Sequence, residues 1–125
     1  MIKSEISKIT AKILINIGAI NFSPQSPFKL SSGFLSPSYI DCRKIIAYPS
    51  AFKAITDMMI DTIQADMIAQ SPNYIIGGET AGIPFAAAIA EKMGLPLSYV
   101  RKKPKDYGKT KSIEGEILKD KNSLL

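Results

Sequence analysis

A dense group of basic side chains lies at residues 101–111, where six Lys and Arg accompany one acid, Asp106. The whole chain has sixteen Lys and Arg against eleven Asp and Glu, so its net charge of +5 equals the excess of this one segment. A local excess of cations attracts anions. This basic segment therefore predicts a site for a negatively charged ligand, with a solvated surface turn as the alternative.

A glycine-rich turn at residues 77–82 is the second feature that can hold an anion. Its backbone amides lie next to the start of a predicted helix, and amides at helix N-termini bind phosphate groups. The apolar run 74–76 before the turn predicts a buried strand, and the apolar stretch 83–93 after it predicts the helix.

These elements belong to a βαβ unit. Pro84 suits the first helical turn, while Gly94 and Pro96 end the helix. A second strand is predicted at 97–100, and a helical crossover of this kind makes the two strands parallel. The glycine-rich turn and the basic segment then leave the carboxyl ends of neighbouring strands, which is the edge where open α/β sheets bind ligands.

The first half of the chain predicts two helices and an irregular hairpin. One helix spans 4–17, begins at Ser4 and ends at Gly18; the other spans 51–65 and is capped by Ser50. Their apolar faces are expected to pack on the core; they comprise Ile6, Ile9, Ile13 and Ile17 in the first helix and Phe52, Ile55, Met59 and Ile63 in the second.

The hairpin is predicted to pair short strands at 28–30 and 38–41, after a connector at 19–27.

Length and composition limit the possible classes of protein. With 125 residues and 46% apolar content, the chain is expected to be one domain. A single cysteine, Cys42, excludes an internal disulfide, and without histidine a structural zinc site is excluded as well. The longest apolar run, 83–90, is too short to span a bilayer.

Taken in order, these motifs resemble the orotate phosphoribosyltransferase family. The resemblance is carried by residues 28–33, by 36–43, and by the run GGETAGIPFAAAIAEKMGLPLSYVRKKPKDYGKTKSIEG at 77–115. It implies an α/β protein with the type I phosphoribosyltransferase fold, which has a parallel sheet with flanking helices and an N-terminal hood. Within one domain, residues 1–48 would form the N-terminal helix and hood, and 49–125 the first part of the α/β core.

The resemblance also implies an activity. Such an enzyme transfers phosphoribosyl from phosphoribosyl pyrophosphate (PRPP) to orotate, giving orotidine 5'-monophosphate and pyrophosphate in pyrimidine (UMP) synthesis in the cytoplasm. Mg²⁺ would be bound mainly through PRPP, with no metal ligand from the protein. The positions that match the family's pyrophosphate site are Arg101, Lys102, Lys105, Tyr107, Thr80 and Ala81, of which Arg101 and Lys105 would be catalytic. Those that match its orotate site are Ser31, Tyr39 and Ile40.

Three of these positions depart from common family residues. Many members have lysine at the position of Ser31, so Lys29 is an alternative partner for the orotate carboxylate. Some members have lysine where Ala81 stands. The usual histidine is replaced by Tyr107, which keeps a hydrogen-bonding group and loses the cation.

Two further expectations follow from the resemblance. The protein would be a homodimer in which the basic segment reaches the partner's active site. The family's PRPP fingerprint, an apolar strand with two consecutive acids and a Thr/Gly-rich loop, should come soon after 113–115 and does not occur in the 125 residues. The chain is therefore expected to be incomplete at its C-terminus and inactive alone.

Two other functions compete with this one. The chain could be a non-catalytic module of the same fold that binds nucleotide or nucleic acid, or a gene fragment with no function. Nucleic-acid binding favours cations spread along a face with interleaved aromatic residues. Here the charge is confined to one segment with a single aromatic residue, Tyr107, so neither nucleic acid nor a membrane is the expected partner.

Overall fold

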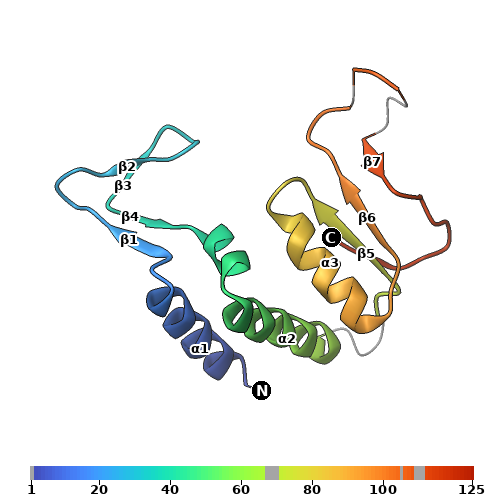
Figure 1. The fold of residues 1–125 in the computed structure, drawn as a ribbon, viewed down its shortest axis with the longest axis horizontal. Helices are drawn as coiled ribbons and strands as arrows, with labels where there is room; N and C mark the ends of the chain where they lie inside the picture. Colours follow the sequence, from blue (N-terminus) through green and yellow to red (C-terminus); the bar gives the residue numbers. More distant parts are fainter. Residues whose placement is uncertain (1, 67–70, 105, 109–111) are drawn as a thin grey trace. The chain divides into compact units, whose positions relative to one another are not determined.

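The computed structural model describes residues 2–66, 71–104, 106–108 and 112–125. The chain divides into two compact units, Met1–Ile55 and Thr56–Leu125 (Figure 1). The first unit contains α1 (Lys3–Asn16), β1 (Ile20–Phe22), β2 (Phe28–Lys29), β3 (Leu35–Ser36), β4 (Ser38–Ile40) and the 3₁₀-helix η1 (Cys42–Ala47). Helix α2 (Pro49–Asp66) begins in the first unit and ends in the second. The second unit continues with β5 (Tyr74–Gly78), α3 (Gly82–Met93), β6 (Leu97–Val100), β7 (Ile113–Glu114) and β8 (Ser123–Leu124).

Helix α1 forms where the isoleucine spacing predicts it, but its first turn differs from the prediction. The helix begins before Ser4, and the backbone N–H of Ile2 donates to the Glu5 carboxylate at 3.4 Å. A carboxylate at this position satisfies an unpaired donor of the first turn, so Ser4 is not needed as the cap. Gly18 follows the last turn with φ +65°, in keeping with its predicted role at the end of the helix.

The hairpin prediction is wrong in its pairing. Strand β2 pairs with β3 in the register Phe28↔Ser36, and β4 pairs instead with β1, in the register Ile20↔Ile40. The range 19–27, predicted as a connector, therefore contains a strand. In the register that forms, the N–H of Gly33, at φ +89°, donates to the Leu30 carbonyl oxygen and reverses the chain, so that 28–29 meets 35–36.

Helix α2 also forms close to its predicted range, with a different start and a different buried face. Its first residue is Pro49, whose missing N–H would have no partner at this position, and Ser50 lies inside the helix. The buried methionine is Met58, with 5% of its surface exposed, whereas Met59 is 39% exposed. Met58 follows Ile55 by three residues on the buried stripe, and Met59 lies one step around the helix.

The second unit is built on a four-stranded sheet in the order β7-β6-β5-β8. Strand β5 is parallel to β6, with Ile75 opposite Leu97, so the predicted βαβ unit is confirmed. Strand β8 is also parallel to β5, and β7 is antiparallel to β6. Strand β8 (Ser123–Leu124) therefore forms the edge of this sheet beside β5.

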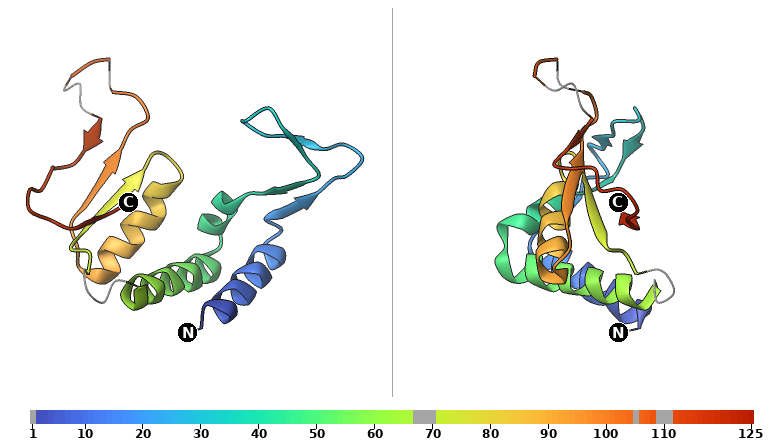
Figure 2. Two further views of the ribbon diagram at one scale, coloured as in Figure 1. Left: turned by 180° about the vertical axis from the view of Figure 1, so that it is seen from behind. Right: turned by 90° about the vertical axis from the view of Figure 1, so that its right-hand side faces the viewer.

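The core of this unit lies between the sheet and α3, which runs beside β5 and β6 (Figure 2). Its buried residues are Ile75, Ala86, Ile89 and Ala90, and partly buried side chains pack around them: Ile60, Ile63, Met93, Leu95 and Leu124. Gly94 ends α3 with φ +64°. In the described part of the chain, no helix combines the length and apolar character needed to cross a membrane.

Candidate functional site

Four of the predicted pyrophosphate residues directly follow β5 and β6, whose carboxyl ends lie at the same edge of the sheet (Figure 1). Thr80 and Ala81 follow β5, are exposed, and immediately precede α3. Arg101 and Lys102 follow β6. The structure thus brings the glycine-rich turn and the start of the basic segment to the same carboxyl edge, as the parallel strands require.

Gly77 allows the glycine-rich turn to be this tight. A Cβ atom at this residue would lie 3.0 Å from the Ala86 Cβ atom and 3.2 Å from the Ile83 Cα atom. Because both neighbours belong to α3, any side chain at position 77 would push the helix away from the end of β5. The glycine therefore keeps the first turn of α3, with its backbone amides, against the sheet edge.

The strands before and after the basic segment, β6 and β7, pair with each other. Val100 lies opposite Ile113 in the antiparallel β6–β7 ladder, and the N–H of Arg101 donates to the Ser112 carbonyl oxygen at 2.7 Å. Beyond these paired residues Lys102 is exposed, and Tyr107 has 78% of its surface exposed. Lys105, the other predicted catalytic residue, lies outside the described residues.

The returning strand is anchored to the sheet by buried hydroxyl groups. The Tyr74 hydroxyl lies 2.6 Å from Ser98 Oγ and 2.6 Å from the Glu116 carbonyl oxygen, to which Ser98 also donates at 2.9 Å. Gly115 lies directly over this pair with φ +96°, and a Cβ atom there would be 2.8 Å from Ser98 Oγ. The chain just after β7 is therefore fixed to the sheet by these hydroxyl groups, and a side chain at position 115 would crowd Ser98.

Arg101 lies between two carboxylates. Its Nε atom is 3.9 Å from Glu79 Oε2, and its Nη1 atom is 3.7 Å from Glu114 Oε1. The Glu114 side chain is only 24% exposed, so this acid is partly buried beside Arg101. The sequence holds no local signal for this pair, because it is the ladder between 99–100 and 113–114 that places this acid near the residue after β6.

The predicted orotate residues lie in the first unit. Ser31 is exposed in the turn between β2 and β3, and Ile40 on β4 is 52% exposed. Tyr39 packs its ring on Phe28, with centroids 5.8 Å apart, and its hydroxyl accepts a hydrogen bond from Arg43 at 3.3 Å.

Arg43 also holds Asp41, a contact that the sequence did not predict. Arg43 Nε donates to Asp41 Oδ1 at 2.8 Å, and the Arg43 backbone N–H donates to the same oxygen at 3.2 Å. These hydrogen bonds and the positive charge hold the pKa of Asp41 below its ordinary value of 3.8. The same hydrogen bond to the carboxylate raises the pKa of Arg43. The pair fixes the end of β4, next to Tyr39 and Ile40.

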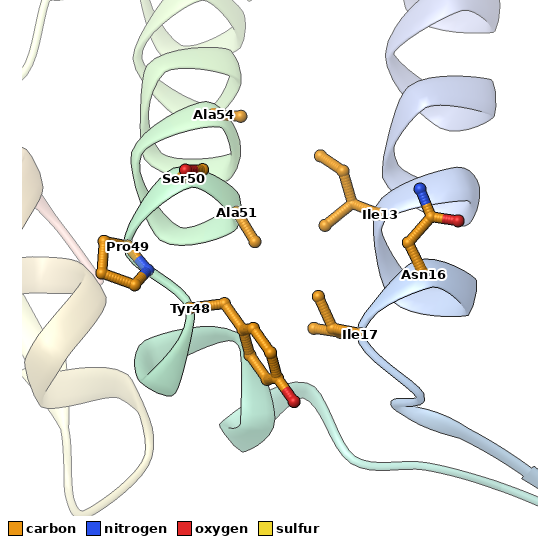
Figure 3. A pocket seen from close by; sticks show the side chains of 8 residues that line it. All are labelled: Ile13, Asn16, Ile17, Tyr48, Pro49, Ser50, Ala51 and Ala54. Atoms are coloured by element: carbon orange, nitrogen blue, oxygen red, sulfur yellow. The ribbon is translucent and has the colours of Figure 1, made fainter.

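A hollow of about 340 Å³ also lies in the first unit and contains none of the predicted site residues. Figure 3 shows Ile13 and Ile17 of α1 pointing toward the first turns of α2 across it. Its lining consists of Ile13, Asn16, Ile17, Tyr48, Pro49, Ser50, Ala51 and Ala54. The isoleucine stripe of α1 thus faces α2 but is only partly covered. The sequence predicts that this stripe packs on the core, yet no residue of α1 is buried.

The described residues contain no group of three or more His, Cys, Asp or Glu that could hold a metal ion. Glu79 and Glu114, beside the start of the basic segment, are paired with Arg101.

No protein-family model matches the chain. Individual proteins do. Orotate phosphoribosyltransferase of Cereibacter sphaeroides (strain ATCC 17029) is 50% identical over 123 residues, which are 98% of this chain and 53% of that protein. The enzyme of the same name from Ruegeria sp. (strain TM1040) is 47% identical over 121 residues, 97% of this chain and 54% of its own. The chain is a homologue of orotate phosphoribosyltransferase.

The fold agrees with this relationship. The crystal structure of orotate phosphoribosyltransferase from Aeropyrum pernix superposes with a TM-score of 0.68 at 33% identity, covering 83% of this chain and 56% of that one. The chain therefore has the type I phosphoribosyltransferase fold that the motifs predict. It spans about half the length of the curated relatives it matches.

Proposed function

We propose that the protein is an orotate phosphoribosyltransferase, which transfers the phosphoribosyl group of PRPP to orotate and releases pyrophosphate. The observation that carries the proposal is the 50% identity to a protein of that name over 98% of this chain. The cationic segment beside a glycine-rich turn supports it, because both suit an anionic leaving group.

In this proposal the second unit stabilises the departing pyrophosphate. Negative charge builds on the leaving group as the bond to the anomeric carbon breaks, and cations and amides fixed at that position lower the barrier. We assign this role to Arg101, Lys102, Lys105 and Tyr107 of the basic segment, with Thr80 and Ala81 supplying the backbone of the turn. Arg101 and Lys105 would contribute most.

The first unit would bind orotate. We assign contacts with the ring to Tyr39 and Ile40, whose strand is held at its end by the Arg43–Asp41 pair. The orotate carboxylate needs a donor, which Ser31 or the nearby Lys29 can supply. Both units would thus belong to one phosphoribosyltransferase domain, with residues 1–48 as helix and hood and 49–125 as the first part of the core.

Three finer points rest on the resemblance alone. Mg²⁺ would be bound mainly through the oxygens of PRPP, where it would neutralise charge on the phosphates. The protein would be a cytoplasmic homodimer whose basic segment reaches the partner's site. Sedimentation at tens of micromolar checks the dimer, and a strict monomer of a form as long as the relatives would contradict it.

Orotate consumption with PRPP and magnesium tests the proposal. We measure it on the chain of 125 residues and on a form extended to the length of the relatives. We expect turnover in the extended form and none in the short one. The absence of turnover in a folded extended form would contradict the proposed function.

Substitutions in the extended form test the assigned residues. Lys105→Ala should lower kcat more than it raises the KM for orotate, since the lysine would meet the pyrophosphate mainly in the transition state. Arg101→Ala and Lys102→Ala should act in the same direction. Lys12→Ala on the exposed face of α1 is the matched control and should change neither constant. Parental activity in Lys105→Ala would remove this residue from the mechanism.

A further inference from the structure

We propose that Glu79 is a positioning residue that ties the glycine-rich turn to the start of the basic segment and holds Arg101 in place. The inference rests on the proposed function, in which Arg101 meets the pyrophosphate. It adds a residue for which the sequence predicted no role.

Glu79 contacts three consecutive residues as the chain leaves β6. Its backbone N–H donates to the Val100 carbonyl oxygen at 2.9 Å. Its Oε1 atom accepts a hydrogen bond from the Lys102 backbone N–H at 3.3 Å, and its Oε2 atom lies 3.9 Å from Arg101 Nε. One residue of the turn therefore fixes both the backbone of the basic segment and its first cation.

The carboxylates position Arg101 by charge. The Arg101 side chain is 29% exposed, and the Glu79 and Glu114 side chains are each 24% exposed, so their attraction is screened less than on an open surface. Both separations, 3.9 and 3.7 Å, exceed hydrogen-bond length, and the buried Nε atom has no hydrogen-bond partner among the described residues. The guanidinium is thus held in place by charge, without a hydrogen bond from Nε to either carboxylate.

The two acids differ in what they connect. Glu114 belongs to β7 and lies opposite Tyr99 in the ladder, so it joins Arg101 to the neighbouring strand. Glu79 immediately precedes Thr80 and Ala81, to which we assign the other half of the pyrophosphate site. Of these two acids, Glu79 is therefore the one that links the two loops that would hold the same ligand, and a change in one loop is passed to the other through its side chain.

Hydrogen exchange of the Lys102 backbone amide tests the link directly on the 125-residue chain. Losing a hydrogen bond worth about 1 kcal/mol should accelerate this exchange roughly five- to tenfold in Glu79→Ala. Glu79→Gln retains an oxygen acceptor and should accelerate it about twofold or less. The Ile75 amide, bonded to Pro96 in the core, is the internal reference and should not change. Glu91→Ala, at an exposed residue of α3, is the matched control.

Titration with magnesium and inorganic pyrophosphate, followed by amide chemical shifts of the same samples, tests the action through Arg101. We expect Glu79→Ala to weaken pyrophosphate binding roughly three- to tenfold and Glu79→Gln to restore most of the affinity. In an Arg101→Ala background the further change Glu79→Ala should have less than about a twofold effect, because the residue it positions is gone.

Each outcome decides one of the two proposals. Unchanged Lys102 exchange in Glu79→Ala overturns the link, whatever the protein binds. A loss of affinity that is equally large with and without Arg101 overturns the positioning of Arg101. A parent chain that binds no pyrophosphate counts against the proposed function, and the exchange measurement then still decides whether Glu79 joins the two loops.

Discussion

The strands of the first unit and those of β5 and β6 are all short, yet their apolar side chains meet different environments. In the hairpins, Phe22 is 73% exposed, Phe34 75% and Leu35 66%. In β5, Tyr74 and Ile75 are 4% and 3% exposed. Both regions contain bulky residues suited to strands, so composition does not explain the difference.

The connections between the strands explain it. Parallel strands β5 and β6 need a crossover, and the crossover helix α3 covers the sheet and completes a core. Antiparallel strands can be joined by short turns, and the β2–β3 connection brings no helix with it. The proposed pyrophosphate residues are thus carried by a covered sheet, and the proposed orotate residues by hairpins whose side chains stay open to a ligand.

The largest expected effect on stability comes from shortening an apolar side chain in the second unit, compared with the same change in the first unit. Ile89→Ala removes a side chain that is 4% exposed and should lower the free energy of unfolding by about 2–4 kcal/mol. Phe22→Ala removes a larger side chain from an exposed strand and should change it by less than about 0.5 kcal/mol. Urea unfolding followed by circular dichroism measures both. Equal losses would show that the first unit is covered as well.

Two glycines give the next comparison. Gly115 and Gly33 both have left-handed φ values, +96° and +89°. Alanine at Gly33 would meet no atom within 4 Å, so only backbone strain of about 1 kcal/mol is expected. At Gly115 the Cβ atom would also approach Ser98 Oγ, and we expect about 2–3 kcal/mol. Denaturation midpoints of the two variants provide the test, and a cost at Gly115 no larger than that at Gly33 would rule out the steric term.

Removing either of two tyrosine hydroxyls should lower the free energy of unfolding by different, smaller amounts. Tyr74→Phe removes the buried hydroxyl that contacts Ser98 Oγ and the Glu116 carbonyl oxygen, at a cost of about 1 kcal/mol. Tyr39→Phe removes an exposed contact with Arg43 and should cost less than about 0.5 kcal/mol. The same unfolding measurement applies, and a smaller loss in Tyr74→Phe than in Tyr39→Phe would contradict the anchoring of the returning strand.

The smallest effect concerns Asp41 in the first unit. Because the hydrogen bond from Arg43 depresses its pKa, the contribution of this contact to stability is complete above 3.8 and is lost as the pH falls through the lower, folded-state pKa. An NMR titration of the carboxyl group should show Arg43→Ala raising the pKa toward 3.8. Lys44→Ala removes only a weaker, more distant charge and should raise it less. An unchanged pKa in Arg43→Ala would exclude the pair as the cause.

Sequence patterns predicted the positions of helices and strands better than they predicted which strands pair and which helix faces are buried. The apolar run at 74–76, Pro84 and Gly94 were enough for β5, α3 and the parallel β6, because these signals act within one strand or one helical turn. The pairing of 28–30 with 38–41 was wrong because two competing registers with similar short strands cannot be ranked locally. The prediction also placed Met59 instead of Met58 on the buried face of α2, because which of two adjacent helical residues is buried depends on what packs against the helix.

The candidate site divides in the same way. The cations of 101–111, the glycine-rich turn and the order of strand, helix and strand were enough by themselves to predict an anion-binding edge, since charge and chain reversal are properties of residue type and spacing. Only the tertiary structure decided that Arg101 lies between Glu79 and Glu114, because these residues are brought together by a parallel and an antiparallel strand pair. Such contacts depend on register across strands, and residues 79, 101 and 114 are too far apart in the chain for a local pattern to record it.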